Sequence, residues 1–179
     1  MLASVFDTFR GLPTHVLIVH AVVVLVPLCF VGVVVAAVSR TWRQRLAIPI
    51  LVLLGVGFVA SLIATRSGHA LRARIGATPA INHHAHIGVW VPWFVLIAWG
   101  LTALWLFLEQ RAGVISLGGG SDAEVLAAPV GSEPSHGIRL TACVLAVASC
   151  GFATAWIAYT GEAGSSAHWR QLVISTNHK

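Results

Sequence analysis

The sequence predicts an all-α integral membrane protein, a four-helix bundle built from two similar helical hairpins. Of its 179 residues, 57% are hydrophobic and only 9% are charged, whereas a soluble domain usually has about 25% charged residues. Four apolar stretches, at 16–38, 46–64, 87–108 and 140–159, lack Asp, Glu, Lys and Arg, and each reaches the ~20 residues that a helix needs to cross a bilayer. Helices are expected because a segment in lipid must satisfy its own backbone hydrogen bonds. The predicted spans form a single membrane domain over residues 1–179, at about 15–38, 46–65, 86–108 and 138–160.

The first hairpin begins where Pro13 and Thr14 open the first span. This span is too long for the apolar core of a cleaved signal peptide, so we expect it to be retained. A short basic turn over 39–45 joins it to the second span. We expect the second helix to end near Gly68, which would cap it, and a loop to follow through Ala85.

The second hairpin contains a third span rich in tryptophan and a fourth with small residues at every fourth position, a spacing typical of close helix packing in lipid. Between them, residues 112–135 are rich in Gly, Ser and Pro and predict a flexible loop. A faint repeat relates the hairpins. Residues 64–68 and 159–164 end the second and fourth spans in similar ways, and His20 precedes Pro27 much as His86 precedes Pro92.

Four spans place both termini and residues 66–86 on one side of the membrane. Arginines crowd the 39–45 turn, so the positive-inside rule predicts that this turn is cytoplasmic. The opposite side would then face the periplasm or exterior of a bacterial inner membrane. The net charge of +5 lies in loops and termini, where it meets lipid headgroups, and no nucleic acid partner is expected. The predicted outward side carries eight of the nine histidines: His15, His20, His69, His83, His84, His86, His168 and His178.

Imidazole binds metals and haem iron and exchanges protons near neutral pH. His20 lies within the apolar zone of the first span, where a polar side chain needs a partner. It is either a ligand or a helix–helix hydrogen-bond donor. His86 begins the third span at a similar depth, and two imidazoles from separate helices suit haem b. Alternatively, His15 and His84 join these two in a Cu or Zn site.

Further candidates surround these four histidines. His69 and His168 are additional candidate metal ligands. Arg66 and Arg72 are candidates to hold haem propionates or lipid phosphates, with ordinary interfacial charge as the alternative reading.

The stretch from Gly11 to Pro27 carries His15 and His20 in a Thr-His, Val-His pattern that ends in Val-Pro. It resembles the opening of a bacterial membrane family called domain of unknown function 2231. That resemblance implies four spans. It also implies a place near respiratory electron transfer, because relatives are fused to Rieske-type iron–sulfur domains.

The leading hypothesis is therefore a membrane subunit that binds haem b or a Cu or Zn ion through outward-facing histidines. It would serve electron transfer beside other membrane subunits or a redox protein, rather than act as an enzyme on its own. A cofactor-free structural subunit of a larger complex is the alternative, and a small transporter is a third possibility.

Overall fold

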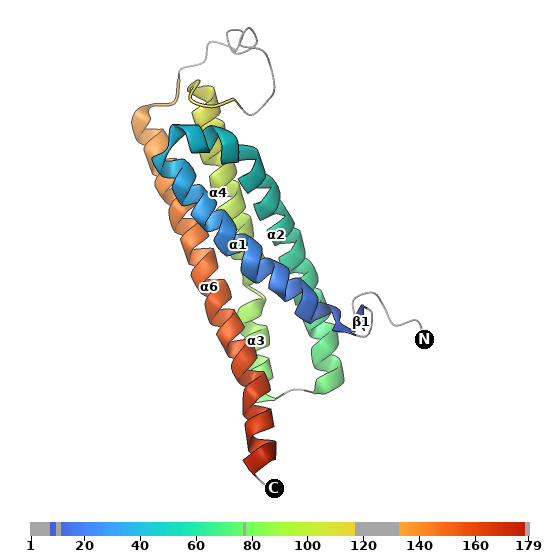
Figure 1. Ribbon diagram of the computed structural model, residues 1–179. Coiled ribbons are helices and arrows are strands. Elements are labelled where there is room, and N and C mark those ends of the chain that lie inside the picture. The colour runs from blue at the N-terminus through green and yellow to red at the C-terminus, as the bar shows by residue number, and fades with distance from the viewer. Residues whose placement is uncertain (1–7, 10–11, 77, 117–132, 178–179) are drawn as a thin grey trace.

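The computed structural model describes residues 8–9, 12–76, 78–116 and 133–177. Four long helices lie side by side (Figure 1), and each is long and apolar enough to cross a membrane. The predicted all-α four-helix bundle is thereby confirmed. The elements in chain order are β1 (Thr8–Phe9), β2 (Leu12–Pro13), α1 (Thr14–Val38), α2 (Arg40–Ile75), α3 (Pro79–Gly88), α4 (Val91–Arg111) and α6 (His136–Asn177).

The two strands are short and pair as an antiparallel turn before α1. Many outward-facing side chains of the helices are large and apolar. Val24 is 61% exposed and Val31 is 57% exposed, both in the middle of α1. Such a surface is stable against lipid and not against water. The fold is therefore that of a multi-pass membrane protein.

The first hairpin, α1 and α2, turns at a single residue. Ser39 caps α2, because its Oγ accepts a hydrogen bond from the backbone N–H of Trp42. The predicted loop from Gly68 through Ala85 is wrong over most of its length: α3 begins at Pro79, and α2 runs on to Ile75, where Gly76 ends it with a φ of 85°. This conformation favours glycine. Gly68 caps nothing, and lies within α2 against a side chain of α1.

The second hairpin consists of α3, α4 and α6, with α3 and α4 forming one interrupted span. Thr78 caps α3, and Pro79 occupies its first turn, a common arrangement since proline lacks the N–H that a helix start leaves unpaired. The interruption falls at Val89 and Trp90, and Pro92 is the second residue of α4. Most of the predicted flexible loop falls on 117–132, outside the described residues.

Buried residues occupy equivalent positions in the two hairpins. The core positions of α1 recur in α4 at a constant offset of 69 residues: Val22 and Val91, Val26 and Val95, Cys29 and Ala98, Val33 and Thr102, Ala36 and Trp105. Those of α2 recur in α6 at an offset of 96 residues: Ile50 and Ala146, Leu54 and Cys150, Ser61 and Ile157, Ala64 and Thr160. Because the first helices of both hairpins cross in the same direction, this pattern describes a pseudo-twofold axis along the bundle.

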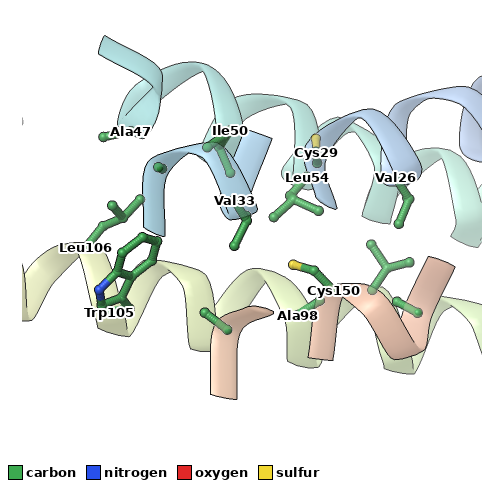
Figure 2. Close-up of a cluster of buried hydrophobic side chains, with 14 of the residues drawn as sticks. Val26, Cys29, Val33, Ala47, Ile50, Leu54, Ala98, Trp105, Leu106 and Cys150 are labelled. Atoms are coloured by element: carbon green, nitrogen blue, oxygen red, sulfur yellow. The ribbon is translucent and has the colours of Figure 1, made fainter. Parts of the chain in front are cut away.

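Corresponding contacts also join the hairpins. Phe30 of α1 packs over Gly151 of α6, and Trp99 of α4 packs over Gly55 of α2. The indole N–H of Trp99 also donates to the carbonyl of Leu51 at 3.0 Å. Small residues at these crossings let the helices approach closely in lipid. The core between the helices holds Val26, Cys29, Val33, Leu54 and Cys150, among others (Figure 2).

Candidate functional site

His15 lies at the start of α1 and is half-buried against α2. Its Nδ1 lies 2.8 Å from the carbonyl oxygen of Ala64. Because a carbonyl can only accept, Nδ1 must be the donor. A Cβ added to Gly68 would lie 3.0 Å from Cε1 of this ring. Glycine at that position therefore makes room for the imidazole.

His84 repeats this arrangement in the second hairpin. It lies on α3, and its Nδ1 donates to the carbonyl oxygen of Thr160 on α6 at 3.0 Å. A Cβ added to Gly164 would lie 3.0 Å from its Cε1. His15 and His84 are 69 positions apart, and their carbonyl partners and glycines are each 96 apart, the same offsets as in the core. The two imidazoles are thus equivalent groups of the two hairpins.

The two rings lie close together on either side of the pseudo-twofold axis. Their centroids are 6.3 Å apart and their planes are inclined at 78°. Since Nδ1 carries the proton in each neutral ring, Nε2 holds the lone pair. No hydrogen bond reaches either Nε2 from another described residue. A backbone carbonyl that fixes the tautomer in this way is the usual support of a ligating histidine.

A cavity of about 770 Å³ surrounds the pair. Its volume is in the range of small-molecule and cofactor sites. All four spans contribute to its wall, which is mainly apolar at the depth of Val22, Val91 and Ile157. Towards the end of the bundle, the wall becomes polar.

The structure brings some of the predicted site residues together and leaves others apart. Besides His15 and His84, the cavity is lined by His20, His69 and Arg72. His86 and Arg66 are exposed and do not line it. Over the part of the chain described, no three His, Cys, Asp or Glu side chains are grouped as metal ligands. His168 lies on α6 with its side chain outside the described part, and residue 178 lies beyond it.

His20 satisfies one ring nitrogen locally. Its ring is exposed, and Nδ1 donates to the carbonyl oxygen of Val16 in its own helix at 2.5 Å. His83 is also exposed and lies 3.4 Å from the hydroxyl of Tyr159. The counterpart of His15 in the second hairpin is therefore His84, and neither His20 nor His86 takes part in the symmetric pair.

An ionic cluster that the sequence patterns do not predict lies at the opposite end of the bundle. Glu109 of α4 is 4% exposed, and its carboxylate lies 2.6 Å from Arg43 and 3.6 Å from Arg139. Arg43 also donates to the carbonyl oxygens of Ala36 and Ala37 in the last turn of α1, each at 2.9 Å. Arg43 and Arg139 are 96 positions apart, so that same offset would have found them.

Comparisons with protein-family models, with curated proteins and with solved structures find no match to this chain. The resemblance to domain of unknown function 2231 stays a prediction. The chemistry of the site depends on its own groups, which are two imidazoles bonded to opposite walls of a mainly apolar cavity.

Proposed function

We propose that this membrane protein binds haem b between its two hairpins, with His15 and His84 as the axial ligands, and serves in electron transfer. The observation that carries the proposal is the pair of equivalent imidazoles, each with Nδ1 bonded to a backbone carbonyl and Nε2 left with its lone pair. Haem, once bound, supplies reversible one-electron exchange. The histidines orient it, and the apolar wall keeps water away.

The donor set favours haem over a bare ion. A structural zinc or copper ion takes most of its four ligands from the protein. In haem, the porphyrin supplies four nitrogen ligands to the iron, and the protein needs to supply only two. Two imidazoles on one metal at about 2 Å each place their centroids roughly 6 Å apart. The observed 6.3 Å fits this separation. Sites between facing helices are also the common position for haem in helical bundles.

The protein purified in detergent with added haem is expected to give the spectrum of six-coordinate, low-spin iron at one haem per chain. His15→Ala and His84→Ala should each remove that species and weaken haem binding at least about tenfold, because each takes away one axial ligand. Since the ring planes are steeply inclined, electron paramagnetic resonance should give the highly anisotropic signal of crossed imidazoles.

His86→Ala is the matched control, because this exposed imidazole lies outside the cavity wall. It should leave the spectrum unchanged. Loss of the low-spin species in His86→Ala but not in His84→Ala would favour the His20 and His86 pairing instead. A wild-type protein with neither a Soret band nor bound iron would overturn the proposal.

A cofactor-free structural subunit is the second candidate, and the same hydrogen bonds favour it. His15 bonds α1 to α2, and His84 bonds α3 to α6, with or without a ligand. Under this reading, alanine at either position lowers the thermal stability of the bundle while no haem binds to the wild type.

We also propose that the histidine side of the bundle faces the periplasm, in or near a respiratory system of a bacterial inner membrane. The arginine-rich turn supports this orientation, and the respiratory setting follows from the family resemblance alone. Thr41 and Asn82 are exposed at opposite ends of the bundle. In intact cells, an impermeant maleimide should label Asn82→Cys, and Thr41→Cys only after permeabilisation. The reverse pattern would invert the orientation. The wild type is the control, because its cysteines lie within the spans, where two are buried and one is half-buried.

A further inference from the structure

The imidazole pair cannot by itself fix which way a ligand lies in the cavity. His15 and His84 are related by the pseudo-twofold axis, and so are their carbonyl and glycine partners. A planar ligand held by these groups alone would fit equally well with either edge towards α2. Any preference must come from residues that break the symmetry.

The polar part of the cavity wall is not symmetric. On α2 the wall includes Thr65 and His69, whereas the equivalent positions on α6 hold Gly161 and Ser165. Arg72 also lines the cavity from α2. The residue of α6 that corresponds to Arg72, 96 positions later, is His168, which carries no permanent charge. Among the described residues of the wall, the permanent positive charge therefore lies on the α2 side, at Arg72.

Arg72 is free to bind an anion. It is half-buried, and among the described residues no carboxylate forms an ion pair with its guanidinium. His69 lies three residues earlier on α2, on the same helix face. A guanidinium at the edge of an apolar cavity binds carboxylate in a bidentate manner. The span ends two residues later, at Arg74, so that an anionic group there would meet the water interface.

We infer that Arg72, assisted by His69, holds the carboxylates of the bound ligand against α2 and so selects one of its two orientations. This inference rests on the proposed haem site and adds a positioning role to it. The porphyrin edge that bears the propionates would lie at Arg72. The carboxylate-free edge would lie against the apolar wall.

Haem and its dimethyl ester, which lacks the carboxylate charges, provide the test. Arg72→Gln is expected to weaken haem binding at least about tenfold and to leave binding of the dimethyl ester unchanged. It should also lower the haem reduction potential, because a cation near the propionates favours the reduced form. Arg66→Gln is the matched control, because this arginine is exposed and outside the cavity wall.

Equal haem affinity and equal potential in wild type and Arg72→Gln would overturn the inference while leaving the haem site intact. Loss of bound anionic lipid from Arg72→Gln, with haem binding unchanged, would overturn it in the same way and assign Arg72 to a lipid phosphate. A wild type that binds neither porphyrin would overturn both this inference and the proposed function.

Discussion

Glu109→Ala is expected to lower the free energy of unfolding by about 3 kcal/mol, because it leaves two half-buried arginines without their buried counter-charge. Glu109 is 4% exposed, and its carboxylate contacts Arg43 at 2.6 Å and Arg139 at 3.6 Å. Arg43 cannot easily turn away, because it also bonds two carbonyl oxygens of α1 and lies 5.1 Å from the Trp105 ring centroid. Thermal unfolding in detergent would measure the loss.

Glu162→Ala is the control for this experiment, since Glu162 is exposed and no ion pair within the described region includes it. It should unfold like the wild type. In a double-mutant cycle with Arg43→Met, the two substitutions should be non-additive by at least about 1 kcal/mol. Additive effects, or a Glu109→Ala protein as stable as wild type, would show that the cluster does not hold this end of the bundle together.

Gly164→Ala is expected to displace the His84 imidazole and weaken its bond to Thr160. The added Cβ would lie 3.0 Å from Cε1 and 3.1 Å from Nδ1 of the ring, which is closer than the usual separation of non-bonded heavy atoms. We expect a loss of stability of roughly 1–3 kcal/mol from overpacking. Haem affinity should also fall about tenfold or more, as for other changes to the support of a ligand. Unfolding and haem titration measure the two effects separately.

Gly161→Ala provides a matched control on the same helix, one turn earlier. A Cβ there would meet nothing within 4 Å, so this variant should be neutral or more stable by up to about 1 kcal/mol, because alanine favours helix over glycine. If both variants bind haem like the wild type, the ring does not depend on Gly164 for its position. Gly68→Ala tests the equivalent support of His15.

The membrane bundle could be predicted because the thickness of the bilayer sets the length of an apolar span, whatever the span contacts in the rest of the protein. The ends of the helices could not be predicted in this way. Helices α2 and α6 continue past the apolar stretch into residues whose hydropathy does not indicate a helix. The α2 end had a usable signal: Gly76, Thr78 and Pro79 mark a helix stop and a helix start. The sequence predicts the stop at Gly68 instead, because a glycine that makes room for a ring and a glycine that caps a helix look alike in sequence.

The cavity histidines His15, His20, His69 and His84 could be predicted as candidates, because imidazoles near an apolar span are few. The predicted pairing of His20 with His86 depends on their similar depth near the starts of the first and third spans. Alignment on the buried positions of α1 and α4 pairs His15 with His84 instead. The carbonyl partners on α2 and α6 could not be predicted. Every residue has a backbone carbonyl, so the type of side chain does not show which carbonyl accepts the hydrogen bond.

Each imidazole is bonded to the second helix of its own hairpin, which has a consequence for biogenesis. As the chain leaves the insertion machinery, α1 and α2 can enter the bilayer and form the His15 half of the cavity before the second hairpin is made. The other half follows in the same way. The complete cavity then arises only when two finished hairpins associate in the plane of the membrane, and a ligand captured at that moment would hold the two halves together.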